Sequence, residues 1–233
     1  LAAVFSLPGV VYSGGDFGGQ PAVRGSAPQD NAFLIDGMPA GYLFHMFGNS
    51  VLNEDLLHDF NLQAGAFDAT VGNSTGGVFS ATLRDPRATP LTTTIDLSML
   101  QMSLLAEGAI SERQSFYVGA RQSTVQYFVG KGDELEDGIT VYQPPKSNDY
   151  QARYLFTPDD RQQLRLTLTG ASDSARANIS KTSEQGRTDP ESVGDATIDT
   201  KFNSAQLAYE LVLTPSLNWH TQLQQMRQTE DNK

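Results

Sequence analysis

The feature that most constrains this chain is a regular alternation of apolar and polar residues that starts just after residue 90. It recurs in seven segments, at residues 91–99, 102–110, 116–120, 150–156, 164–168, 205–213 and 217–223. Because successive side chains of a β-strand point to opposite faces, each segment predicts a strand with one apolar face and one polar face. We therefore expect about seven strands in the second part of the chain.

The connections between these strands are unequal in length. Three are short, at residues 111–114, 157–161 and 214–216, whereas those near 130–148 and 176–199 are long and polar. In a meander, alternate connections lie at the same end of the sheet, so one end has short turns and the other has long loops. Bacterial outer-membrane barrels have this arrangement. Aromatic residues lie close to the short turns, as in an interfacial girdle: Phe116, Tyr154, Phe156 and Trp219.

A soluble β-sandwich is the alternative, because its strands also carry one apolar and one polar face. Periodicity alone does not separate the two architectures. The polar face resembles a hydrated lumen because it mixes charges of both signs with small polar residues; its charged or ionisable positions are Asp96, Glu107, Arg121, Arg153, Arg165, Glu210 and His220. Together with the unequal connections, this face favours a barrel, while the sandwich stays open.

A different kind of sequence precedes the strands. Residues 1–84 are rich in glycine and contain short apolar runs, which predicts a small α/β domain with tight turns. We expect one short helix over residues 49–60, and a turn at Asp36–Gly37 that ends a buried strand. Two prolines and three charged residues in the stretch 84–90 predict a linker between the two parts.

Composition excludes several functions. With 16 basic and 27 acidic residues the formal charge is −11, and no basic cluster occurs, so we expect no nucleic-acid partner. The chain has no cysteine, and His45, His58 and His220 lack zinc-site spacing. Nucleotide-binding and hydrolase motifs are missing, and we interpret the acidic run 133–137 as a solvated loop rather than a Ca²⁺ site. We expect no enzyme, no cofactor and no bound metal.

Several short motifs in the first part occur in an order that resembles the plug domain of TonB-dependent outer-membrane receptors. They are Leu7–Val10, Val23–Gly25, Asp30–Pro39, Ala64–Phe67, Val71–Gly72 and Gly76–Arg84. The resemblance departs at Val71–Gly72, where the family usually has Tyr-Gly. It implies a membrane β-barrel fold, with residues 1–86 as most of a small α/β plug inside the lumen. Residues 87–233 would then be the first seven or so strands of an antiparallel barrel of 22 strands.

The same resemblance implies a function. It implies active transport of a scarce ligand, a ferric siderophore or a similar chelate, by a multi-pass protein of the bacterial outer membrane. The implied partners are TonB with its proton-driven inner-membrane complex, the outer-membrane lipid and the small-molecule substrate. We expect the chain to be an internal piece of a longer protein, with the TonB box and most of the barrel outside it. The alternatives are a soluble β-rich ligand- or carbohydrate-binding module without transport activity, and a β-rich hydrolase.

Two loops are candidate ligand contacts. The stretch 40–48 is rich in aromatic residues and methionine, and the resemblance places it at the plug apex facing the extracellular vestibule. Such side chains suit a planar or hydrophobic ligand, and the residues we expect to make contact are Tyr42, Phe44, His45 and Met46. A second apical contact is expected at Asp16 and Phe17. Packing beneath the barrel loops, and a plain flexible turn, are the respective alternatives.

Three charged residues are candidates for pairing between plug and barrel. The resemblance implies that Arg24 pairs with carboxylates on the inner barrel wall. Asp36 and Arg84 are further candidates for ion pairs. A solvated surface arginine is the alternative for Arg24, where an exposed pair contributes only about 0–1 kcal/mol.

Overall fold

The computed structural model describes residues 6–13, 20–67, 71–72, 74–136 and 138–231. In these ranges the chain is built almost entirely of β-strands, and the α-helix α1 (Glu184–Thr188) is a single short turn. No helix among them has the length and apolar character needed to cross a membrane.

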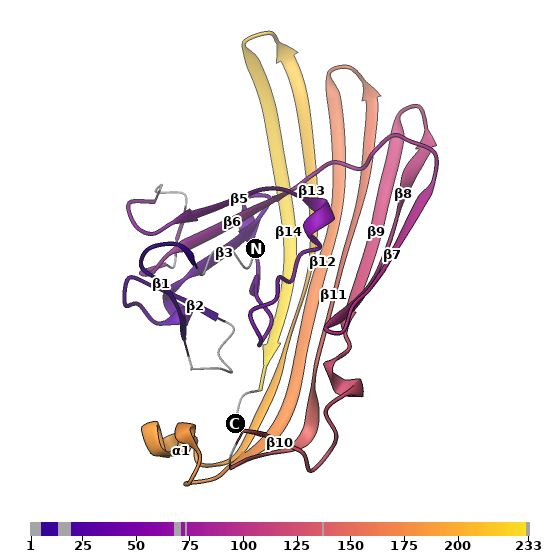
Figure 1. The fold of residues 1–233 in the computed structure, drawn as a ribbon. Helices are drawn as coiled ribbons and strands as arrows, with labels where there is room; N and C mark the ends of the chain where they lie inside the picture. The colour runs from indigo at the N-terminus through magenta and orange to yellow at the C-terminus, as the bar shows by residue number, and fades with distance from the viewer. Residues whose placement is uncertain (1–5, 14–19, 68–70, 73, 137, 232–233) are drawn as a thin grey trace.

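The second part of the chain forms one large antiparallel sheet (Figure 1). Its strands are β7 (Thr92–Leu97), β8 (Gln101–Ser111), β9 (Gln114–Ser123), β11 (Ile139–Asp159), β12 (Gln162–Ile179), β13 (Gly194–Thr214) and β14 (Leu217–Glu230). Each pairs with the next along the chain, and the short strand β10 (Glu134–Glu136) pairs with β11. The seven predicted strands are therefore all present, in a meander.

The two ends of this sheet differ as predicted. The turns at 112–113, 160–161 and 215–216 lie together at one end, uppermost in Figure 1. The opposite end carries the connection 98–100 and the longer loops 124–138 and 180–193, which contain η5 (Val125–Tyr127), α1 and η6 (Pro190–Ser192). We call these the short-turn end and the long-loop end.

The long loops are shorter than the sequence indicated. Residues 139–148 belong to β11, and residues 176–179 and 194–199 belong to β12 and β13. These extensions are paired through backbone hydrogen bonds, for example Val141 with Ala177. Apolar and polar residues do not alternate regularly there, because a strand that extends beyond an apolar layer has no need of one uniformly apolar face.

The N-terminal region, residues 6–86, packs against one face of this sheet (Figure 1). It contains a hairpin of β1 (Val10–Ser13) and β2 (Gln20–Val23), and a second sheet in the order β4-β3-β6-β5. The strands of this second sheet are β3 (Ala32–Ile35), β4 (Met38–Pro39), β5 (Leu57–Gln63) and β6 (Val78–Leu83), with β3 and β6 parallel.

The expected α/β character of this region is wrong for its described residues, which hold two 3-10 turns, η3 (Pro28–Asp30) and η4 (Glu54–Leu56), and no α-helix. The helix expected over 49–60 is one such turn, capped by the Asn53 side chain, followed by β5. Tertiary pairing explains the difference: β6 is buried and needs a second neighbour, and β5 supplies it in antiparallel register. Helical spacing of apolar residues does not outweigh those backbone hydrogen bonds.

The turn expected at Asp36–Gly37 is confirmed. Both residues have left-handed backbone angles, with φ of 51° and 77°, as in the type I′ hairpin turn that joins β3 to β4. Asp36 accepts a hydrogen bond from the backbone N–H of Leu83 at 3.0 Å, which ties the turn to the end of β6.

Apolar side chains of both parts form a shared core. Leu56, Phe79 and Ile35 of the N-terminal region cluster with Leu105 and Tyr117 of the large sheet. A second cluster joins Tyr42 and Val51 to Ala171 and Phe202. Gly41 is required there, because a Cβ at that position would lie 2.8 Å from the Phe202 side chain. Full burial of each large apolar side chain contributes about 1.5–3 kcal/mol, so the two parts stabilise each other.

The large sheet thus has two different faces. The inward face contacts the N-terminal region, and its polar side chains are buried, including Glu107, Arg153 and Gln206. The outward face is apolar and uncovered: Ile95 and Leu223 are each 64% exposed and Trp219 is 58% exposed. No second sheet or helix layer among the described residues covers this face, which disfavours the soluble sandwich.

Candidate functional site

The candidate site is the interface between the N-terminal region and the inward face of the large sheet. Alternation places the charged residues of β8, β9, β11 and β12 on that face, at the positions where an ordinary core would be apolar. Four groups of ion pairs cross the interface: Asp36 with Arg153, Arg84 with Glu107, Asp85 with Arg165, and His45 with Asp149 and Asp173.

Arg153 of β11 holds the turn that Asp36 begins. Its guanidinium pairs with the Asp36 carboxylate and donates a hydrogen bond of 2.8 Å to the carbonyl of Leu83. Its Nε donates to Thr167 at 3.0 Å, so the side chain is fixed on both sides. The Arg153 side chain is only 2% exposed, so its charge is held out of water, where it would be costly without these partners.

Arg84 makes a two-pronged pair with Glu107 of β8. Its Nη1 lies 2.7 Å from Oε2 and its Nη2 lies 3.0 Å from Oε1. Arg87 reaches the same carboxylate at 3.0 Å from the far side of the linker. This fork-like geometry fixes the direction of the chain as it passes from the N-terminal region into β7 (Thr92–Leu97).

His45 is clamped between two carboxylates of the large sheet. Its Nδ1 lies 3.0 Å from both oxygens of Asp173, and its Nε2 lies 3.1 Å from Asp149. Ionised carboxylates only accept hydrogen bonds, so both ring nitrogens must carry a proton and the imidazole is a cation. Burial opposes that charge, but the hydrogen bonds and charges of the two aspartates outweigh it and raise the pKa of His45 to about 9.

The clamp is electrically balanced. Arg121 donates from Nε to Asp149 at 2.8 Å and from Nη2 to the carbonyl of Ser50 at 2.6 Å. Two cations, His45 and Arg121, thus face two anions. Tyr42 lies against His45 with ring centroids 6.3 Å apart, and burial followed by the charge of Asp173 raises the pKa of its phenol above the ordinary value.

The structure places three of the expected ligand contacts inside the interface. Tyr42, Phe44 and His45 are 5%, 0% and 2% exposed, so in this conformation they are buried between the N-terminal region and the sheet. The alternation of small and bulky side chains in 40–48 reflects that packing, because Gly41 admits Phe202 and the aromatic rings fill the remaining space. Asp16 and Phe17 lie outside the described residues.

Met46, another of the expected ligand contacts, borders a pocket. Together with its neighbour Phe47 it borders an apolar cavity of about 140 Å³ at the long-loop end. The opposite wall comes from β11, β12 and β13 and includes Ile139, Val141 and Ile198. Phe47 is 36% exposed and was not expected from the sequence as a contact, although it lies in the same aromatic stretch.

Arg24 lies outside the group of ion pairs that cross this interface. Its side chain is exposed, and within the ranges that the structure describes no ion pair joins it to a carboxylate of the sheet. It follows the end of β2 with a left-handed backbone angle, φ 53°, and packs beside Gly9 and Gly65. Of the three charged candidates for pairing, Asp36 and Arg84 form ion pairs with the sheet.

Sequence reasoning marked Glu107, Arg121, Arg153 and Arg165 only as polar-face residues, and it missed Asp149 and Asp173 altogether. The signal that could have found them is the alternation of the strands, because each of these residues occupies an inward-facing position of its strand. No cluster of three or more His, Asp or Glu side chains in the described ranges is arranged to hold a metal ion.

Comparison with known proteins gives a clear result for the fold. No family model matches the chain, and no curated protein matches it. Solved structures do match. The ferric citrate transporter FecA superposes with a TM-score of 0.64 at 12% identity, over 100% of this chain and 38% of that one.

Two further structures agree. The ferric enterobactin receptor of Pseudomonas aeruginosa matches with a TM-score of 0.61 at 12% identity, over 97% of this chain and 38% of its own. The outer membrane transporter YddB of Escherichia coli matches with a TM-score of 0.56 at 15% identity, over 89% and 32%. The chain spans well under half the length of each of these proteins, and it has the fold of the corresponding part of these outer-membrane receptors and transporters.

Proposed function

We propose that this chain is part of a TonB-dependent transporter of the bacterial outer membrane, with residues 1–86 as the plug and residues 87–233 as the first strands of the barrel wall. The observation that carries the proposal is the contrast between the two faces of the large sheet. The outward face is apolar and uncovered, while the inward face is polar and holds the N-terminal region by buried ion pairs. A soluble protein would place its apolar face inside.

The height of the apolar face suits a membrane. Between Asn203 and Leu213 the outward positions of β13 are Ala205, Leu207, Tyr209 and Leu211. A strand tilted by about 40° rises roughly 25 Å over that stretch, which is the height of the apolar band on outer-membrane barrels. Trp219, Tyr154 and Phe156 lie towards the short-turn end of the band, where an aromatic girdle is expected.

The ion pairs explain why such a plug needs an energy source. As a buried pair begins to separate, each charge loses its partner while both are still out of water, and the loss of one partner of a buried pair costs about 3–5 kcal/mol. Moving the N-terminal region away from the wall would break the contacts of Asp36, Arg84 and His45 together. Thermal fluctuation rarely supplies such energies, so the closed state is stable until TonB pulls on the plug.

We infer that the transported ligand is a metal chelate such as a ferric siderophore. Support comes from the names of the similar structures, which include a ferric citrate transporter and a ferric enterobactin receptor. The apolar cavity beside Met46 and Phe47, at the long-loop end, gives such a ligand a first contact on the side away from the short turns.

Uptake measurements test this function. The full-length gene, expressed in a strain lacking its own copy, should direct the protein to the outer-membrane fraction, and the protein should require detergent for extraction. Cells should accumulate radioactive iron from one or more ferric siderophores, and deletion of TonB should abolish the accumulation. Recovery of the protein in the soluble fraction would instead favour a β-rich binding module.

A further inference from the structure

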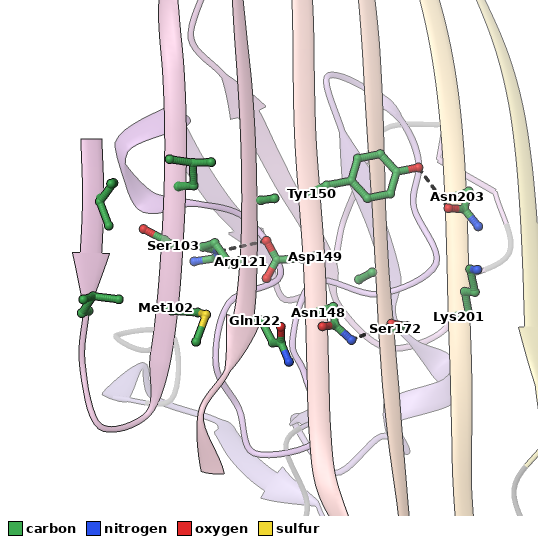
Figure 2. A pocket seen from close by; sticks show the side chains of 15 residues that line it. Met102, Ser103, Arg121, Gln122, Asn148, Asp149, Tyr150, Ser172, Lys201 and Asn203 are labelled. Atoms are coloured by element: carbon green, nitrogen blue, oxygen red, sulfur yellow. Dashed lines mark hydrogen bonds and ion pairs between the residues drawn. The ribbon is translucent and has the colours of Figure 1, made fainter. Parts of the chain in front are cut away.

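A hollow of about 660 Å³ lies on the outward face of the large sheet, on the side opposite to the N-terminal region (Figure 2). Arg121 and Asp149 contribute to its floor, but their side chains turn towards the N-terminal region behind the strands. The residues that rise around the hollow on the outward side include Met102, Tyr150 and Asn203. Its volume is within the range of small-molecule sites in proteins.

Strand register shows which outward residues border this hollow. One row of paired outward positions runs from Leu104 through Ala120 and Tyr150 to Asn203. The next row towards the long-loop end begins with Leu97 and Met102 on β7 and β8 and continues with the polar residues Gln122, Asn148, Ser172 and Lys201. The hollow is lined by both rows, so its side on β7 and β8 is apolar and its side towards β13 is polar.

The rim of the hollow is held in place. The Tyr150 ring lies flat over Gly170, where a Cβ would come within 2.5 Å of the ring, and its hydroxyl donates to Asn203 Oδ1 at 3.0 Å. Asn148 donates to the Ser172 hydroxyl at 3.4 Å. Ala120 leaves the floor low, so the space between these side chains is kept open.

The charge beside this hollow is positive although the chain as a whole carries −11. Lys201 lies in the same row as Ser172. Arg227 of β14 is paired with Asn203 and so lies in the row of Tyr150 and Asn203. Neither row contains a carboxylate within the described strands, and the first acidic residue on this face, Asp199, lies one row farther out. No ion pair within the described ranges joins Lys201 or Arg227 to a carboxylate.

We propose that this hollow binds a membrane lipid whose headgroup carries a phosphate and a net negative charge. An acyl chain lies against Ile95, Leu97 and Leu104, and the phosphate contacts Lys201 and Arg227, with amide donors from Gln122 and Asn148. This inference rests on the proposed function, because it requires the outward face to lie in a membrane. Among possible occupants, an anionic lipid matches both the apolar wall, through its acyl chain, and the cationic edge, through its headgroup. A second copy of this chain would have to bring its net charge of −11 close to that of the first copy.

The test uses the intact transporter purified in detergent, with phosphatidylglycerol or phosphatidylcholine added and bound lipid counted by native mass spectrometry. Phosphatidylglycerol adducts should persist at collision energies that remove phosphatidylcholine. Lys201→Gln should lower the apparent affinity for phosphatidylglycerol about fivefold, as expected for one basic residue near a membrane surface. Lys181→Gln, in the exposed loop 180–193, is the matched charge control and should have no effect.

A second pair of variants tests the shape of the hollow. Ala120→Leu fills its floor without changing charge and should reduce the phosphatidylglycerol adducts, whereas Ala205→Leu adds the same bulk elsewhere on the outward face and should not. Equal adducts in all variants, or equal retention of the two lipids, would overturn the proposal. So would a protein dimer that Ala120→Leu dissociates, because a second copy would then cover the hollow.

Membrane fractionation and iron uptake of the same variants test the proposed transport function independently of the lipid site. Normal uptake with lipid binding that is insensitive to Lys201 and Ala120 would refute the lipid site and leave the transport function standing. Extraction of the protein without detergent would refute both proposals.

Discussion

His45 Nδ1 lies 3.0 Å from both carboxylate oxygens of Asp173, although the two residues are 128 positions apart in the chain. The contact joins the N-terminal region to β12, near the middle of the large sheet. With Asp149 on the other side of the ring, the histidine is held from two strands at once. His45 is thus a direct link between the stretch 40–48 and the wall against which it packs.

Removing this link should loosen the N-terminal region. Replacing His45 with Ala leaves Asp149 and Asp173 with one fewer cation in a buried site, and the loss of one partner of a buried pair costs about 3–5 kcal/mol. We expect faster proteolysis of residues 1–86 in the purified protein and greater sensitivity of cells to large antibiotics. His58→Ala is the control, because His58 is exposed on β5. Identical proteolysis of the two variants would contradict the role of His45.

The same link should depend on pH. The pKa of His45 is raised from 6.5 to about 9 in the folded protein, so its contribution is complete below pH 6.5 and is lost as the pH rises through 9. The difference corresponds to about 3 kcal/mol at most. Thermal unfolding between pH 6 and 10 should show this loss. His45→Gln should lack that component, and a wild-type profile as flat as that of the variant would count against it.

The linker end of the interface offers a mutant cycle. Arg84→Met alone leaves Glu107 buried with only the exposed Arg87 as partner, so it should destabilise the docked state by about 3–5 kcal/mol. Arg84→Met combined with Glu107→Gln removes the unpaired charge, so the double variant should be more stable than the single one. Chemical unfolding of the detergent-solubilised protein measures both. A double variant whose loss equals the sum of two separate losses would show that the two residues do not interact.

The ligand cavity can be tested through Phe47. Phe47→Ala removes the most exposed aromatic side chain of the stretch 40–48 from the cavity wall, so it should weaken ligand binding several-fold. Uptake measured over a range of ligand concentrations should show a higher half-saturation constant with an unchanged maximal rate. Phe33→Ala, in the core of the N-terminal region, is the comparison, since it should reduce the amount of folded protein and leave the half-saturation constant unchanged. A half-saturation constant unaffected by Phe47→Ala would exclude the cavity as a binding surface.

The sequence predicted the large sheet well because alternation is a local property that each strand carries by itself. It predicted the turn at Asp36–Gly37 for a similar reason, since two adjacent residues determine a type I′ turn. The helix expected over residues 49–60 failed because β5 exists only through its pairing with β6, which lies about twenty residues farther along the chain.

The candidate site was harder to predict. Arg153 and Glu107 are recognisable as inward charges, but their partners depend on how the N-terminal region docks, and no local pattern encodes that. Arg24 illustrates the difficulty, because its place next to Gly25 resembles a family motif while its side chain is exposed. Asp36 and Arg84, which do pair with the sheet, lie at two points where strands of the N-terminal region end.

Placement of the outward face in a membrane predicts that the cost of a charge depends on its depth. Leu207 lies within the apolar band of β13, and Leu207→Arg should destabilise the folded protein by about 2–4 kcal/mol. Asn203→Arg, at the edge of the band, should cost only about 0–1 kcal/mol. Reversible unfolding in lipid vesicles measures both values. Gln206 is not a suitable control position, because its side chain faces inward and contacts the N-terminal region. Equal costs at positions 203 and 207 would mean that no hydrocarbon layer covers this face, and the proposed transporter would then be wrong.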